Sequence, residues 1–180
     1  MKKRALSLLL FMTLILSLLT ACGNSKETFN KYISDLESLR LFSLSGASDA
    51  ETLSKYAAEV WYSAIKGEYN IYSGGTYEDF NVALAKFYAD DNLLSPRLIS
   101  NIESNQATVS DIMKRLQNPP KDLDKCYDTA MELYSCYNSL TKLAISPSGN
   151  YNSYTENRRD YIDNFLKYYE LLEIQIPDKK

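Results

Sequence analysis

Apolar side chains recur at steps of three and four residues along most of the chain, which is the period of an α-helix with one buried face. The first such stripe runs through Phe29, Ile33, Leu36 and Leu39. The same period predicts six helices: about Lys26–Phe42, from Ser48 to the Ser73-Gly74-Gly75 break, from Thr76 to Asp90, from Ser95 to Gln117, Lys121–Ile145, and from Ser153 to Pro177.

Short polar stretches separate these segments and supply their boundaries. Ser43–Ala47 contains a glycine and predicts a break, after which Ser48 and Glu51 fit a capping box that would start the next helix. Asn118-Pro119-Pro120 forces a stop because proline cannot continue a helix. No alternation of apolar and polar residues is long enough to predict a strand.

These elements predict an all-α fold, a bundle of five or six antiparallel helices that spans residues 28–176. Helices joined by loops of about two to eight residues usually pack antiparallel to their neighbours in sequence. The segment Lys121–Ile145 has the broadest apolar face, so we expect it to lie at the centre of the bundle.

The N-terminal segment has a different pattern. Lys2, Lys3 and Arg4 precede an apolar run of 17 residues, Ala5–Ala21. A basic start, an apolar middle and small residues at the end are typical of a secretory signal peptide. The run ends in Leu19-Thr20-Ala21-Cys22, which resembles the lipobox of bacterial lipoproteins.

This resemblance implies cleavage before Cys22, whose thiol would carry a diacylglyceryl group, with acyl chains such as palmitate holding the protein on the membrane. Residues 1–21 would be the signal peptide, and residues 22–27 the lipidated cysteine with a short tether. The protein would then lie on the extracytoplasmic face of the cell membrane. Two alternatives stay open: an uncleaved N-terminal anchor, and a soluble secreted form cleaved after Ala21.

The body of the chain also resembles small helical lipoproteins of Gram-positive bacteria. The likeness lies in Asn118-Pro119-Pro120, in the helix that contains Tyr127, Tyr134 and Tyr137, and in Pro147-Ser148-Gly149. It implies a place in the cell envelope and carries over no catalytic residue.

Composition narrows the chemistry. The chain has no histidine, which removes the commonest general base and metal ligand. Loss of the three basic leader residues would take the net charge from −3 to −6, so nucleic acid is not an expected partner. The densest acidic stretches, Asp90-Asp91-Asn92 and Asp122 with Asp124, lack the spacing of a calcium loop. We expect no enzyme activity, no cofactor and no metal.

Two cysteines remain beyond the lipobox. Cys126 and Cys136 are ten residues apart on one predicted helix. They would therefore lie about 15 Å apart along its axis, too far for a disulfide, which needs Cα atoms within about 7 Å. We predict two buried free thiols that fill the core.

Tyrosine is unusually abundant, with 15 residues. Two interpretations stay open: ordinary core packing, or an aromatic recognition face, because tyrosine is enriched at interfaces. The candidate binding residues are Trp61, Tyr62, Tyr69, Tyr72, Tyr154, Tyr161 and Tyr168.

The leading hypothesis is a membrane-anchored, non-enzymatic helical binding module. Its partners would be membrane lipid, through acylated Cys22, and an envelope protein. One alternative is a bundle that holds a small apolar molecule in an enclosed pocket. Another is a prophage-type envelope lipoprotein that excludes a second phage.

Overall fold

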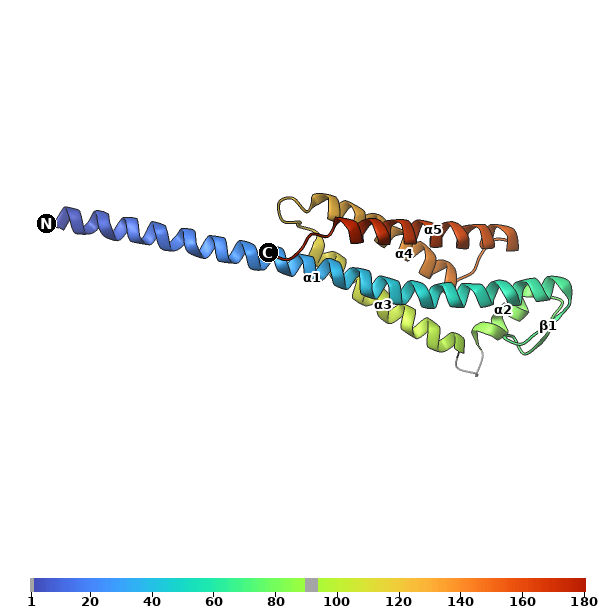
Figure 1. Ribbon diagram of the computed structural model, residues 1–180. Coiled ribbons are helices and arrows are strands. Elements are labelled where there is room, and N and C mark those ends of the chain that lie inside the picture. The colour runs from blue at the N-terminus through green and yellow to red at the C-terminus, as the bar shows by residue number, and fades with distance from the viewer. Residues whose placement is uncertain (1, 90–93) are drawn as a thin grey trace.

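The computed structural model describes residues 2–89 and 94–180, with the side chains of 25–89 and 94–180. Its elements are α1 (Lys2–Lys66), β1 (Tyr69–Asn70), β2 (Gly75–Thr76), α2 (Phe80–Tyr88), α3 (Leu94–Leu116), α4 (Asp124–Ile145) and α5 (Tyr151–Gln175) (Figure 1). The predicted all-α class is confirmed. The side chains of the predicted signal peptide and of Cys22, and the whole of Asp90-Asp91-Asn92, lie outside what is described.

The predicted break at Ser43–Ala47 is wrong, because α1 passes through this stretch without interruption. The Ser48 and Glu51 capping box is wrong for the same reason: Thr52 Oγ1 donates to the Ser48 carbonyl at 2.9 Å, a contact within a helix. Gly46 serves close packing here. A Cβ added to it would lie 2.9 Å from the Cβ of Asn105 and closer still to the Tyr137 hydroxyl.

α1 ends before the predicted break at Ser73-Gly74-Gly75. It stops at Lys66, and Gly67 follows with a φ of +66°, a left-handed conformation that favours glycine. A short antiparallel hairpin comes next, with Tyr69 paired to Thr76 and Asn70 to Gly75. Strands of two residues are too short to show an alternating pattern in the sequence.

The later helices match their predicted segments, with shifts of up to four residues at the ends; the largest is at α2, whose predicted start, Thr76, lies on β2. α2 is capped by Asp79, whose carboxylate accepts from the Asn81 backbone N–H at 2.7 Å. Ser95, the predicted cap of the next helix, is buried inside α3, and its hydroxyl donates to the Phe87 carbonyl. α5 begins two residues before the predicted Ser153, because Asn150 is its cap.

The core lies between α1 and the other helices. α1 contacts each of α2, α3, α4 and α5, and α4 packs along α5. In the view of Figure 1, the pair α4 and α5 lies on one side of α1, with α2 and α3 on the other. α1 thus contacts all the other helices. α4, which the sequence predicted at the centre, contacts α1, α3 and α5, and its Ala144 carbonyl accepts a hydrogen bond from Tyr88 of α2. Large side chains with no more than 2% exposure fill the interior, among them Leu36, Leu53, Ile102, Leu133 and Phe165.

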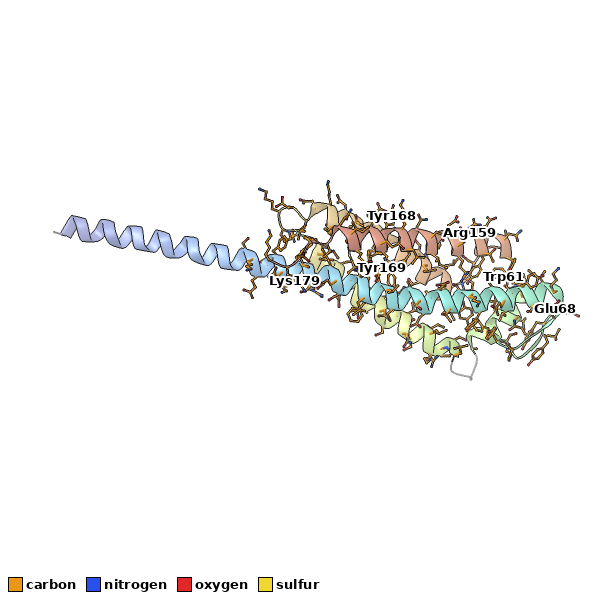
Figure 2. All side chains as sticks on the ribbon, in the orientation of Figure 1. Trp61, Glu68, Arg159, Tyr168, Tyr169 and Lys179 are labelled. Carbon is orange, nitrogen blue, oxygen red and sulfur yellow. The ribbon has the colours of Figure 1, made fainter. Side chains whose placement is uncertain are left out.

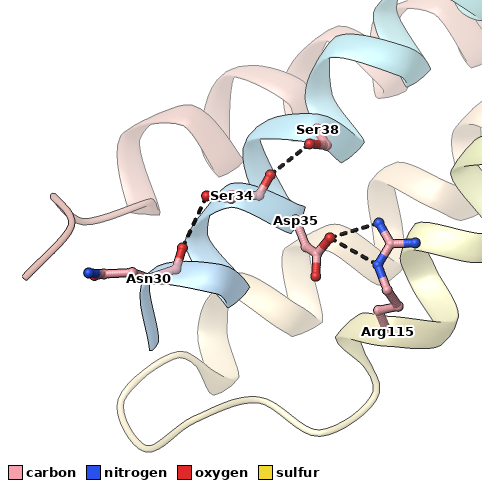
Figure 3. Close-up of polar contacts among 5 residues, drawn as sticks. All are labelled: Asn30, Ser34, Asp35, Ser38 and Arg115. Carbon is pink, nitrogen blue, oxygen red and sulfur yellow. Dashed lines mark hydrogen bonds and ion pairs between the residues drawn. The ribbon is translucent and has the colours of Figure 1, made fainter. Parts of the chain in front are cut away.

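Polar contacts fix the end of the bundle where the described side chains begin. Arg115 on α3 donates from Nε and Nη2 to Asp35 Oδ1 on α1, at 3.0 and 2.7 Å (Figure 3). After α5, Lys180 returns to α1 and exchanges two hydrogen bonds with the Asn30 side chain, at 2.8 and 2.9 Å. Lys179 pairs with Glu37 at 2.7 Å. Figure 2 shows Lys179 far from Trp61, which lies toward the other end of α1.

Candidate functional site

Aromatic side chains gather at the end of α1 that leads into the hairpin. Trp61 stacks on Phe80 of α2 with ring centroids 5.0 Å apart, and it also contacts Tyr154 at 5.5 Å and Tyr151 at 6.5 Å. Tyr62, one residue further along α1, lies 5.8 Å from Tyr151. The C-terminal part of α1, the start of α2 and the start of α5 therefore meet in one aromatic cluster.

Two of the seven predicted binding residues lie in the core. Trp61 is 3% exposed and Tyr154 is fully buried. The Tyr154 hydroxyl donates to the Ser54 carbonyl at 3.2 Å, and burial raises the pKa of its phenol above the ordinary range. These two rings pack beneath the exposed residues of the cluster and present little accessible surface to a partner.

Two other predicted residues are open to solvent. Tyr62 is 44% exposed and Tyr69, on β1, is 67% exposed. Tyr72 is half-buried and stacks on Tyr56 at 4.2 Å. Tyr161 and Tyr168 are half-buried further along α5, and neither lines the grooves that adjoin the cluster. The structure thus brings Trp61, Tyr62 and Tyr154 together and leaves Tyr161 and Tyr168 apart from them.

An open groove of about 620 Å³ lies against the aromatic cluster, and we call it the apolar groove. Trp61, Ile65 and Phe80 supply its apolar lining, and Asn150 and Asn152 add amide groups. Lys66 is its one charged lining residue, with Nζ 5.6 Å from the centre of the Tyr62 ring. Because the groove is open to solvent, it differs from the enclosed pocket that the small-molecule alternative predicts.

A second groove of about 470 Å³ adjoins the first, and we call it the charged groove. Lys55, Arg158 and Glu59 are its charged lining residues. Tyr62 and Tyr151 line both grooves, so this ring pair forms a shared aromatic ridge.

The Arg158 side chain is held in place by neighbours on α1. Its Nε donates to Ser54 Oγ at 3.1 Å, and Nη2 lies 3.6 Å from a carboxylate oxygen of Glu51. Lys55 and Lys66 form no ion pair with any residue that the structure describes. Lys55 and Lys66 therefore bring positive charge to the two grooves without an ion-pair partner in the described part of the chain.

Sequence reasoning missed Phe80 and Tyr151 as parts of the site. Phe80 is half-buried, and its stacking on Trp61 depends on the packing of α2 against α1. The sequence held one signal for Tyr151. It is an aromatic residue directly after the clearest loop of the chain, Ser146–Asn150, and it is the first residue of a helix.

The predicted free thiols are confirmed, since Cys126 and Cys136 form no disulfide. Cys126 is buried, and its Sγ lies 3.3 Å from the Gln175 carbonyl. Cys136 is only half-buried, which differs from the predicted full burial. Burial raises the pKa of both thiols, and this disfavours the reactive thiolate.

Comparisons with protein-family models, with curated proteins and with solved structures find no match. Among the described residues, no three acidic, cysteine or histidine side chains are grouped so that they could hold a metal ion. Within residues 25–89 and 94–180, whose side chains the structure describes, no helix has the length and apolar character needed to cross a membrane.

Proposed function

We propose that the protein is a lipid-anchored, non-enzymatic binding module on the extracytoplasmic face of the cell membrane, and that its partner is an envelope protein. The observation that carries the binding role is the aromatic ridge of exposed Tyr62 and half-buried Tyr151 between two open grooves. Exposed tyrosine with a polar rim is typical of protein interfaces. The motif Leu19-Thr20-Ala21-Cys22 supports the anchor.

The geometry of α1 fits this role. Phe29 lies seven residues after Cys22, and Tyr62 lies 33 residues further along the same uninterrupted helix. At a rise of about 1.5 Å per residue, these 33 steps place the ridge about 50 Å from Phe29. A lipid on Cys22 would thus hold the grooves well away from the membrane, toward other envelope components.

We also propose the antiparallel arrangement of the helices. Its support is the order of the contacts along α1. Asp35 and Ser45 meet Arg115 and Asn105 of α3. Arg40 and Glu51 meet Glu173 and Arg158 of α5. In both helix pairs, the residue numbers of successive contacts rise along α1 and fall along α3 or α5, as they do in antiparallel helices.

The chemistry of the grooves supports binding over catalysis. Aromatic rings, amides and lysine predominate in their linings, and the chain has no histidine to act as a general base. The apolar groove suits one or two anchoring side chains of a partner, and the surrounding polar groups suit the rim of an interface.

The anchor is tested by metabolic labelling of cells with an alkyne analogue of palmitate. We expect label on the wild-type protein in the membrane fraction and none on a Cys22→Ala variant. An unlabelled wild-type protein in the soluble fraction would contradict the proposed anchor.

The binding role is tested by cross-linking on intact cells. A photoreactive benzoyl-phenylalanine is placed at Ile65, which lines the apolar groove, or at Ile174 on α5 as a control. Both isoleucines are exposed, at 54% and 82%. We expect a discrete protein adduct from position 65 that is absent from position 174. The same adducts at both positions, or none at either, would contradict an envelope-protein partner at this groove.

A further inference from the structure

The two grooves differ in chemistry although they share one ridge. The apolar groove has aromatic and aliphatic walls, whereas the charged groove is lined by Lys55, Arg158 and Glu59. With Lys66, three cationic side chains and one carboxylate line the pair. The whole chain has the opposite balance, with 20 basic and 23 acidic residues. A positive site on an acidic protein favours an acidic partner and disfavours a basic one.

The ridge itself offers hydrogen-bonding groups to a bound chain. The hydroxyls of Tyr62 and Tyr151 form no hydrogen bond with the part of the protein that the structure describes, and neither does the indole N–H of Trp61. Asn152 is exposed and lines the apolar groove. An extended peptide has unpaired backbone N–H and C=O groups that these donors and acceptors can satisfy.

Resting on the proposed function, we propose that the partner presents an extended segment with an apolar side chain two residues from an acidic one, and that this segment crosses the ridge. The apolar side chain enters the groove of Trp61, Ile65 and Phe80, and the acidic one reaches Lys55 and Arg158. In an extended chain, residues i and i+2 project from the same face and lie about 7 Å apart.

The charged contacts favour a carboxylate over a neutral group. Arg158 is positioned by Ser54, and its 3.6 Å approach to Glu51 is long for a charge-assisted hydrogen bond. Glu51 is also half exposed, so an incoming carboxylate competes with a weak partner. Lys55 is exposed and gives a second positive charge without a preformed pair.

The probe for the test is a phage-displayed library of random 12-residue peptides. It is selected against the full-length, lipid-modified protein in phosphatidylcholine nanodiscs. We expect the enriched peptides to carry an aromatic, leucine or proline residue two positions from an aspartate or glutamate. A synthetic peptide of that sequence should bind at least tenfold more weakly to Tyr62→Ala. Its acidic-to-lysine version should bind at least tenfold more weakly to the wild type, and affinity should fall as salt rises.

Matched variants separate the site from general effects of substitution. Lys55→Gln and Arg158→Gln should each weaken the peptide several-fold. Arg159→Gln and Tyr69→Ala should leave its affinity unchanged, since neither residue lines a groove. Lys55 has no ion pair within the described chain, so Lys55→Gln is not expected to disturb folding. It therefore tests the charged groove even if Arg158→Gln perturbs the fold. Thermal melting of each variant checks the fold.

Three results would overturn the inference: enrichment without an acidic residue, equal binding by the Lys55 and Arg159 variants, or binding of purified wall glycan in place of peptides. Failure here leaves the broader proposal standing if cross-linking from Ile65 still traps a protein. Loss of both the peptide selection and the adduct would remove the binding role at this groove altogether.

Discussion

At the scale of single residues, close contacts around Tyr137 set how α1 and α4 approach. The Tyr137 hydroxyl is buried without a hydrogen-bond partner among the described residues, and it lies where a side chain on Gly46 would project. A buried hydroxyl with no partner costs free energy. This contact explains why a glycine is placed within a continuous helix, where it would otherwise be unfavourable.

Gly46→Ala should destabilise the fold. The added methyl group overpacks against Tyr137 and Asn105, at a cost of about 1–3 kcal/mol. The better helix propensity of alanine offsets up to about 1 kcal/mol. Urea unfolding should therefore give a lower free energy of unfolding than the wild type, whereas Ser48→Ala, on the exposed side of α1, should change it by less than about 0.5 kcal/mol. A Gly46→Ala protein of equal or higher stability would contradict this packing.

Tyr137→Phe and Tyr154→Phe should have opposite effects on stability. The first removes an unsatisfied buried hydroxyl and should raise the free energy of unfolding by about 1 kcal/mol. The second removes a hydroxyl that donates to the Ser54 carbonyl and should lower it by about 1 kcal/mol. The two variants are compared by chemical unfolding under identical conditions, and losses of equal size in both would show that the hydroxyls do not differ as described.

At the scale of elements, the sequence predicted α2 to α5 well because their ends carry local signals. Asn118-Pro119-Pro120 cannot continue a helix, and polar residues predicted helix starts at Thr76 and Ser153, each three residues from the caps that the structure has, Asp79 and Asn150. The predicted break at Ser43–Ala47 was wrong because Gly46 does not end a helix here. It leaves room for Tyr137 and Asn105, which are distant in sequence. Propensities and capping patterns of neighbouring residues cannot predict a contact of this kind.

The candidate site could be predicted only where its residues are neighbours in the sequence. Trp61 and Tyr62 stood out as aromatic residues on one predicted helix, and both line the apolar groove. Their partners Phe80 and Tyr151 come from α2 and α5 and join them only through tertiary packing. Tyr161 and Tyr168 share the aromatic composition but lie elsewhere along α5, so residue type alone did not identify the site.

The cap of α5 is expected to support both stability and the ridge. Asn150 Oδ1 accepts from the Ser153 backbone N–H at 3.0 Å, directly beside Tyr151. Asn150→Ala should cost about 1 kcal/mol in the free energy of unfolding. Asn157→Ala, at an exposed position inside the same helix, should leave stability unchanged or slightly higher. Thermal unfolding followed by circular dichroism compares the two, and an equal change in both would argue against the cap.

At the scale of the whole molecule, buried or half-buried tyrosines on four helices link stability to pH. Burial raises the pKa of Tyr32, Tyr88, Tyr137 and Tyr154 above the ordinary value of about 10. The folded state therefore holds these protons more tightly than the unfolded state. Their contribution to stability is complete below pH 10 and is lost as pH rises above it.

This linkage predicts cooperative alkaline unfolding. The titration is followed by tyrosinate absorbance at 295 nm, through and above the ordinary tyrosine pKa of about 10. The buried tyrosines should ionise together at higher pH, in one step that coincides with loss of the helical circular dichroism signal. A single smooth titration of all tyrosines, with the helices intact throughout, would contradict the burial described.

The central claim is that the Tyr62–Tyr151 ridge is where the protein binds its partner. The most direct test is the dissociation constant of the protein trapped by cross-linking from Ile65, measured against wild type, Tyr62→Ala and Tyr69→Ala. We predict a loss of at least tenfold, about 1.4 kcal/mol, for Tyr62→Ala and less than twofold for Tyr69→Ala. Equal affinities for Tyr62→Ala and the wild type would contradict the claim.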